Sequence, residues 1–569
     1  MIQPMNRESP LPRHDFPFVP PHSPDRRGLA IDLALLIAWP LMLLAITREW
    51  LFTPPGEIDA WVYFGTSANL THNLVTFAGT YYVGRLSWIL PGALAYAALP
   101  PVVANIGLHL AVFYGATLGC YTCLRLTVGR RAALVTALLL GAYPPFVHAV
   151  GWDYVDGVGL AYFLLAVGSG TAAARGIRPS WWSVVSGICV GACLISSLAW
   201  ATVLPAYVLC LITVSPRMPV RTYSRRTLEV VVGATLSILA CALVNARITG
   251  DPWFFLPSFT MARRLTSDLK PQLPTYSWIW ERASLGTAVA LFLVSVSRVL
   301  RWRAGDGTRE RVAWHLAWAW SATAMLPFRI NGTPVLQFTP YGSYLIPGMA
   351  LATGALIASP LQQLSGRMFS VIVAVGLGAW SVVFATGTTF DAVPTQFAFV
   401  LSLAGVMLAA FFLRGASVRP LAAAIAFACI SLVFLLHIER VSAEPGGRER
   451  NFHLTVDALA QLTPIQAQGK RMYFWYADDA PPALSTAYLS VSSCYLWGYS
   501  LFSTKFPSRV TPEGTVNTAQ PRQRIVLLSE HPQALADVEA SLGAAITVVH
   551  ESRVARDAVS FSMLVFDVR

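Results

Sequence analysis

Long apolar runs separated by short polar segments occupy most of the chain. A helix needs about 20 apolar residues to cross the hydrocarbon core of a bilayer, and about thirteen runs approach that length. The pattern predicts a polytopic α-helical membrane protein. The expected spans lie near 29–46, 102–124, 132–148, 157–173, 181–197, 199–214, 227–246, 278–298, 312–328, 341–359, 368–388, 396–413 and 420–437.

Arginine is distributed unevenly between the two sets of loops that these spans create. With the amino terminus inside, the inner segments collect 21 Arg residues and the outer loops collect 8 Lys or Arg residues. Cytoplasmic loops carry an excess of Lys and Arg, so this orientation is favoured over the opposite one. An odd number of spans then places everything after His437 outside.

Three regions follow from the pattern. Residues 1–28 are Pro-rich, polar and basic, and we expect a disordered cytoplasmic arm. Residues 29–437 form the transmembrane region, with a long first outer loop at 47–101 in which 60–100 predicts one or two amphipathic helices on the membrane surface. Residues 438–569 predict an outer soluble α/β domain with a small, partly parallel sheet. Its expected helices and strands lie at 453–462, 532–543, 471–476, 524–528, 546–550 and 559–568.

Composition narrows the class of protein further. Apolar residues make up 55% of the chain and charged residues only 12%, whereas a soluble domain carries about a quarter charged residues. The net charge of +12 is due almost entirely to arginine, which fits inner loops better than a nucleic-acid partner. No Gly-rich dinucleotide or Walker loop is present, so no nucleotide site is expected.

Two carboxylates follow the first apolar run directly. Glu57 and Asp59 lie between a Pro-Pro-Gly break and an aromatic segment with Trp61 and Tyr63. The adjacent apolar slab can raise a carboxyl pKa or favour metal binding. Asp59 could act as a general base on an acceptor hydroxyl, with Glu57 orienting it or sharing a divalent cation. A pair of solvated loop charges is the simpler alternative.

A second acidic segment reaches the same side two crossings later. Asp153 and Asp156 share one helical face and could bind a cation through oxygen ligands. Alternatively, one of them caps the following helix. Asp59, Asp153 and Asp156 are therefore candidate ligands of a divalent metal such as Mg²⁺ or Mn²⁺, and no other cofactor is expected.

Basic residues are scarce in the outer loops, which makes those that occur there informative. Arginine matches phosphate oxygens in a bidentate manner. Each cation alone could be an ordinary surface charge, but as a set they favour an anionic lipid headgroup or a diphosphate. The candidates are Arg85, Arg263, Arg264, Lys270 and Arg329.

Together these features resemble the GT-C superfamily of glycosyltransferases, which includes protein O-mannosyltransferases, aminoarabinose transferases of lipid A and oligosaccharyltransferases. The resemblance covers roughly residues 29–440. It rests on the acidic motif Glu57-Ile58-Asp59, a first outer loop with Tyr82, Arg85 and Pro91, acids in the second outer loop, and an outer soluble domain after many spans.

The resemblance implies that Asp59 is the catalytic base. It also implies that Asp153 and Asp156 assist it or bind metal, and that the outer basic residues hold the donor phosphate. Two departures stand out. The adjacent Asp-Glu pair of the mannosyltransferases is interrupted here by Ile58, and the W-W-D-Y-G motif of the oligosaccharyltransferases is missing from 438–569. The second departure argues against transfer of an N-glycan.

The expected protein is a multi-pass glycosyltransferase of the bacterial inner membrane that works on the periplasmic side, in contact with membrane lipids. It would move a sugar, with inversion, from a polyprenyl-phosphate or diphosphate donor to a hydroxyl of a glycan, lipid or protein acceptor. A transporter or lipid flippase, and a non-catalytic assembly protein, are the alternatives. A transporter needs intramembrane charges along a pathway, for which Asp32 is the main candidate.

Overall fold

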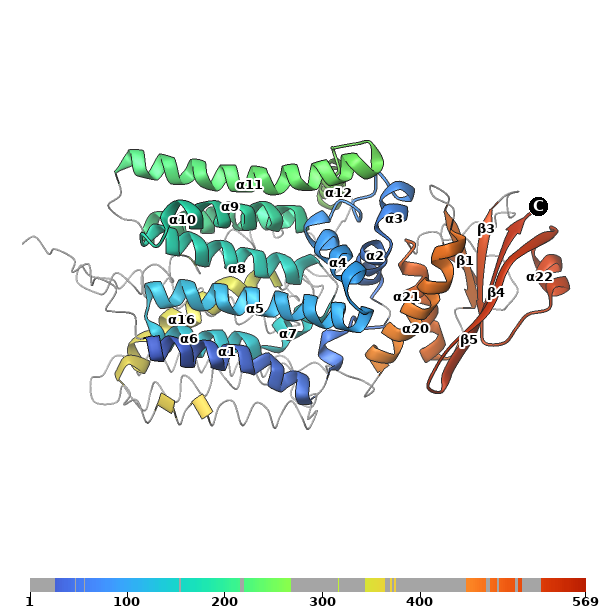
Figure 1. Ribbon diagram of the computed structural model, residues 1–569, viewed down its shortest axis with the longest axis horizontal. Helices are drawn as coiled ribbons and strands as arrows, with labels where there is room; N and C mark the ends of the chain where they lie inside the picture. Colours follow the sequence, from blue (N-terminus) through green and yellow to red (C-terminus); the bar gives the residue numbers. More distant parts are fainter. Residues whose placement is uncertain are drawn as a thin grey trace, which may run out of the picture.

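The computed structural model of the chain places its long apolar helices in one bundle, with a domain of strands and shorter helices at one end (Figure 1). The predicted spans at 278–298, 396–413 and 420–437, with nearly all of 312–328 and 368–388, lie outside the described residues. The residues described are 26–46, 48–55, 57–152, 155–214, 219–267, 316, 343–363, 369–370, 373–374, 447–466, 471–477, 480–496, 500–503 and 523–569.

Within these residues, five helices are long and apolar enough to cross a membrane. They are α1 (Arg26–Ile46), α5 (Pro101–Thr127), α8 (Val155–Ala174), α9 (Pro179–Ser196) and α11 (Val220–Thr249). Each coincides with a span expected from the sequence. The total of about thirteen spans remains a prediction from segment length.

Three other expected spans lie in shorter elements of the bundle. The span at 132–148 is divided at Tyr143, because Pro144 follows and disfavours a helical conformation of the residue before it. The span at 199–214 begins as a 3₁₀ helix and continues as an α-helix. The elements are α6 (Arg130–Ala142), α7 (Pro144–Gly151), η2 (Leu198–Val203), α10 (Leu204–Val214) and α16 (Ile346–Gln363).

The first outer loop folds into short helices between the bundle and the sheet domain (Figure 1). The residues from Ala60 to Ser67 are all buried, so this stretch is an interior element and not the surface helix expected from the sequence. The sheet domain packs against it on the side away from the bundle (Figure 1). The helices are η1 (Glu49–Leu51), α2 (Ile58–Ala68), α3 (Leu70–Thr76) and α4 (Leu86–Ala98).

The carboxyl-terminal domain contains a five-stranded sheet in the order β2-β1-β3-β5-β4. The β2–β1 and β1–β3 pairs are parallel, and β3–β5 and β4–β5 are antiparallel. The partly parallel sheet expected from the sequence is therefore present. Its strands are β1 (Met472–Ala477), β2 (Ser500–Ser503), β3 (Arg524–Ser529), β4 (Ile546–Arg556) and β5 (Val559–Val568), and the helices of the domain are α20 (Gly447–Leu462), η5 (Thr463–Ile465), α21 (Pro482–Ser493) and α22 (Leu535–Leu542).

Candidate functional site

The first acidic motif forms the start of helix α2. Glu57 occupies the residue before the helix, and Asp59 lies in its first turn. The indole Nε1–H of Trp61 donates to the carbonyl of Pro54 at 3.2 Å, which ties the preceding loop back onto the helix. Negative charge is favoured at a helix amino terminus, so this position suits a carboxylate that must stay ionised.

A tyrosine hydroxyl orients the Asp59 carboxylate. Tyr82 donates to Oδ1 of Asp59 at 2.9 Å. Burial and the neighbouring Asp59 raise the pKa of Tyr82, which keeps the hydroxyl protonated and able to donate. Tyr82 was part of the family resemblance in the sequence, but only the structure shows this contact.

Glu57 lies in a less polar environment than an ordinary loop carboxylate. Burial raises the pKa of Glu57, the nearby Asp59 raises it further, and Arg448 acts in the opposite direction. Arg448 belongs to helix α20 of the carboxyl-terminal domain. The domain therefore contributes a charge to the site that sequence reasoning did not identify.

The second acidic segment packs directly against the first loop. A Cβ on Gly151, at the end of α7, would overlap the carbonyl of Trp50 in η1, so the backbones are in contact there. Asp153 lies outside the described residues. Asp156, in the first turn of α8, is only 1% exposed.

Asp156 is held by residues that are distant in the sequence. Its Oδ1 accepts a hydrogen bond from the Tyr344 hydroxyl, and that hydroxyl lies 2.9 Å from Oγ of Ser197. Among the described residues, Oδ2 of Asp156 has no hydrogen-bond partner. Asp156 is within electrostatic range of both Asp59 and Arg85, so the two acidic segments converge.

Arg85, one of the predicted phosphate-binding cations, lies at this convergence. It is near Asp156, Tyr344 and Tyr63, and its guanidinium lies 5.7 Å from the ring centroid of Tyr81. Its Nε and Nη1 atoms are buried and have no hydrogen-bond partner within the described part of the chain. Buried donors without partners are costly, so these atoms are suited to receive the oxygens of an anionic ligand.

Within the described residues, the structure does not bring the other predicted phosphate-binding cations to the site. Arg263 lies in α12 (Leu256–Ser267) and is exposed, although the segment before this helix contacts Gly84 beside Arg85. For Arg264 only the helical backbone is described, and Lys270 and Arg329 lie outside the described residues.

The described carboxylates do not fit a divalent metal by themselves. No group of three or more His, Cys, Asp or Glu side chains suited to a metal occurs in the parts of the chain that are described. Asp59 and Asp156 each use Oδ1 to accept a tyrosine hydroxyl. The third predicted ligand, Asp153, lies outside those parts, and the reaction proposed below has no metal step.

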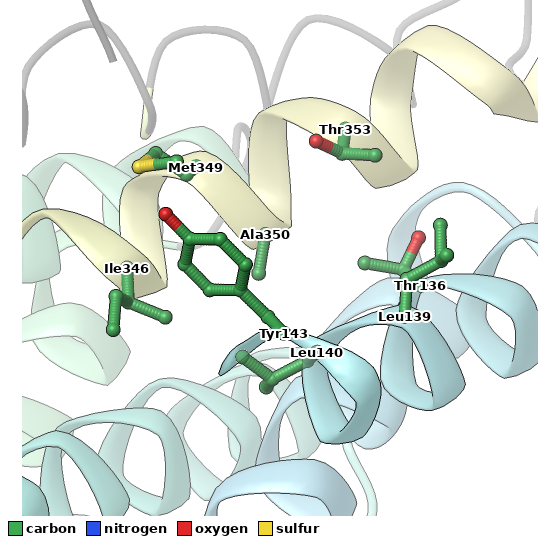
Figure 2. A pocket seen from close by; sticks show the side chains of 8 residues that line it. All are labelled: Thr136, Leu139, Leu140, Tyr143, Ile346, Met349, Ala350 and Thr353. Atoms are coloured by element: carbon green, nitrogen blue, oxygen red, sulfur yellow. The ribbon is translucent and has the colours of Figure 1, made fainter. Parts of the chain in front are cut away.

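Asp32, the main candidate for a transport pathway, has a structural role. Arg130 donates to its Oδ2 at 2.8 Å and its Oδ1 at 2.9 Å, and Tyr121 donates to Oδ2 at 2.7 Å. This carboxylate is fully paired and fastens α1 to α5 and α6. A small pocket between α6 and α16 is lined mostly by apolar side chains such as Leu140 and Met349, and by no carboxylate (Figure 2).

No family model and no curated protein matches the chain. The chain is similar to the structure of ArnT from Cupriavidus metallidurans bound to undecaprenyl phosphate, with 16% identity, coverage of 95% of this chain and 97% of that chain, and a TM-score of 0.48. It is also similar to the archaeal oligosaccharyltransferase AglB from Archaeoglobus fulgidus in complex with an inhibitory peptide and a dolichol-phosphate, with 14% identity, coverage of 81% and 63%, and a TM-score of 0.40.

A third similar structure is the Archaeoglobus fulgidus oligosaccharyltransferase in complex with Zn and sulfate, with 13% identity, coverage of 81% and 61%, and a TM-score of 0.38. The resemblance stated from the sequence included the oligosaccharyltransferases, and structures of that kind are among those to which the chain is similar. Because the TM-scores are below 0.5, the roles of residues and the activity are argued from the site itself.

Proposed function

We propose that the chain is a glycosyltransferase that takes a sugar from a polyprenyl-phosphate or diphosphate donor at the outer face of the membrane. One observation carries the proposal. Asp59, Asp156 and Arg85 come from three separate segments, and Asp156 lies within electrostatic range of the other two. Helix α2, which begins next to Asp59, lies between the bundle and the carboxyl-terminal domain (Figure 1). Transfer from a phosphate leaving group requires a base for the acceptor and a cation with free donors for the phosphate, and Asp59 and Arg85 supply these two groups near Asp156.

The proposed reaction is a single displacement with inversion. The donor lies with its polyprenyl tail in the bilayer and its phosphate against Arg85. Asp59 removes the proton from the acceptor hydroxyl while the hydroxyl oxygen bonds to the anomeric carbon. The bond between that carbon and the phosphate oxygen breaks, and its electron pair leaves with the phosphate. Arg85 stabilises the negative charge that develops there.

The neighbouring side chains keep these two groups in place. Tyr82 orients the carboxylate of Asp59 through its hydroxyl. Asp156, itself fixed by Tyr344, attracts the Arg85 guanidinium and so holds this part of the first loop against α8. Each of these roles needs a fixed geometry, because a misplaced reacting group loses much of its catalytic effect.

The location of the site suggests the donor and the compartment. We propose that the site faces the periplasm of a bacterial inner membrane, that the amino terminus is cytoplasmic, and that the carboxyl-terminal domain lies on the acceptor side. The acceptor would be a hydroxyl on a glycan, lipid or protein of the cell envelope. Lipid phosphates of the proposed donor class are bound in the ArnT and AglB structures described above.

Transfer of labelled sugar from a polyprenyl-linked pool, in membranes that contain the protein, tests this proposal. Asp59→Asn nearly preserves size and removes the base, so transfer should fall at least about 100-fold. Asp251→Asn is a matched control on an exposed outer loop and should transfer like the wild type. Equal transfer by Asp59→Asn and wild type would refute the role of Asp59. No transfer by wild type from any polyprenyl-linked donor would favour a transporter.

A further inference from the structure

A side chain of the first outer loop caps the first helix of the carboxyl-terminal domain and so joins the two parts. Glu49 in η1 is only 5% exposed, and its Oε2 accepts the backbone N–H of Arg448, in the first turn of α20, at 2.8 Å. Next to it, Arg48 and Glu449 form a salt bridge at 3.0 Å. A carboxylate at a helix amino terminus satisfies free N–H groups and the helix dipole, so this contact fixes where α20 begins.

Aromatic packing continues the junction one turn further along α20. The ring of Phe452 lies 5.3 Å from that of Phe52 and 5.2 Å from that of Phe64, between ring centroids. Phe52 precedes the acidic motif and Phe64 follows it. Helix α20 therefore contacts the chain on both sides of the turn that leads into Asp59.

The side chain of Arg448 adds a buried positive charge near the motif. Arg448 is 8% exposed and lies within electrostatic range of Glu49 and Glu57. Burial lowers the pKa of Arg448 to about 10, and the two glutamates oppose that shift. Its Nη1 has no hydrogen-bond partner among the described residues. A buried cation is costly unless opposite charges lie near it, so the charges of Glu49 and Glu57 stabilise the buried guanidinium of Arg448 and are stabilised by it.

The position of Glu57 affects the orientation of the Asp59 carboxylate. Glu57 is the residue immediately before α2, and its carbonyl accepts the backbone N–H of Trp61 at 3.4 Å. Asp59 lies in the turn that this bond closes. A displacement of Glu57 would therefore change the orientation of the Asp59 side chain, even when neither Asp59 nor Arg85 is substituted.

We propose that Arg448 is a positioning residue for the transfer reaction, through which the carboxyl-terminal domain holds Glu57 and the first turn of α2 so that Asp59 faces the acceptor hydroxyl. The effect on transfer rests on the function proposed above, whereas the effect on the first turn of α2 does not. The domain is then part of the catalytic apparatus as well as a cover for the acceptor side.

The full-length protein with Arg448→Met, Arg448→Lys or Arg556→Met tests the proposal. Arg556 is an exposed arginine in β4 and serves as the matched control. Three quantities are measured: the transfer rate at saturating donor, the affinity for farnesyl phosphate, and the hydrogen exchange of backbone amides in residues 57–61. The last two need no transfer activity.

We expect the Met variant to transfer at least about tenfold more slowly, because small displacements of a reacting group are costly. Its farnesyl phosphate affinity should stay near that of the wild type, while exchange at 57–61 becomes faster. Arg448→Lys should restore most of the transfer rate and most of the protection from exchange. Arg556→Met should change neither quantity. A loss of phosphate affinity equal to the loss of rate would instead make Arg448 part of the donor site.

The proposal would be overturned if Arg448→Met transferred sugar at the wild-type rate and its amides at 57–61 exchanged as in the wild type. If the wild type itself transfers no sugar, the proposed function fails, and the exchange measurement still decides the positioning role. Faster exchange in the Met variant with recovery in the Lys variant would support that role, and unchanged exchange would refute it.

Discussion

Arg85 is the residue whose environment most clearly indicates an anionic ligand. Its buried Nε and Nη1 lack partners among the described residues, and each hydrogen bond to a charged group contributes about 1.5–3 kcal/mol. Arg85→Met should therefore weaken binding of farnesyl phosphate by about 10- to 100-fold. Arg247→Met, an exposed arginine in the last turn of α11, should change it less than about threefold. Isothermal titration in detergent measures both affinities. Equal losses in the two variants would place the phosphate elsewhere.

The individual residues of the site differ in how far the sequence could identify them. Glu57 and Asp59 could be found because they are rare outer acids directly after an apolar run. Tyr344 contacts Asp156 across 188 positions, and Arg448 contacts Glu49 across 399 positions. No local pattern records such contacts, since they depend on how the bundle and the carboxyl-terminal domain fold together.

Helix α2 depends on a glycine where it packs against the carboxyl-terminal domain. A Cβ on Gly65 would overlap the backbone of Cys494, just after α21. Gly65→Ala should therefore weaken the junction by about 1–3 kcal/mol, as overpacking does elsewhere. The apparent unfolding temperature of the full-length protein should fall, and protease should cleave the variant faster. Gly107→Ala, at a position in α5 with open space around it, is the control and should show neither change.

Among the elements, those defined by hydrophobic length were predictable and those defined by tertiary contact were not. The long apolar helices coincide with expected spans because a membrane-crossing helix is encoded locally. The first strand was expected within one residue of β1 because its aromatic and apolar run is continuous. Helix α21 and the four-residue strand β2 were missed. Their sequences are rich in serine, which carries little propensity for either structure.

For the molecule as a whole, the burial of α2 has the largest functional consequence. A helix that was expected on the membrane surface is enclosed by the bundle on one side and by α20 and α21 on the other. Asn73 also donates to the carbonyl of Cys494 at 2.9 Å, and Asn69 and Gln466 exchange two hydrogen bonds. Membrane region and carboxyl-terminal domain should therefore unfold together, and the stability of the whole chain should report on the carboxylates buried at the junction.

Glu49 makes that stability depend on pH in a direction that can be worked out. Burial raises the pKa of Glu49, although the backbone N–H of Arg448 opposes the shift. A carboxyl group with a raised native pKa stabilises the fold fully below its unfolded-state pKa of about 4.3, and this contribution is lost as the pH rises through the native pKa. Glu49→Gln keeps an oxygen that can cap α20 but does not titrate.

The unfolding temperature of Glu49→Gln minus that of the wild type should therefore be larger at pH 7 than at pH 4.5. Thermal unfolding of both full-length proteins in the same detergent, across this pH range, measures the difference. Burial also raises the pKa of Glu57, so adding Glu57→Gln should increase the effect in the same direction. A difference that is constant with pH would mean that Glu49 titrates normally and that the junction leaves it in contact with water.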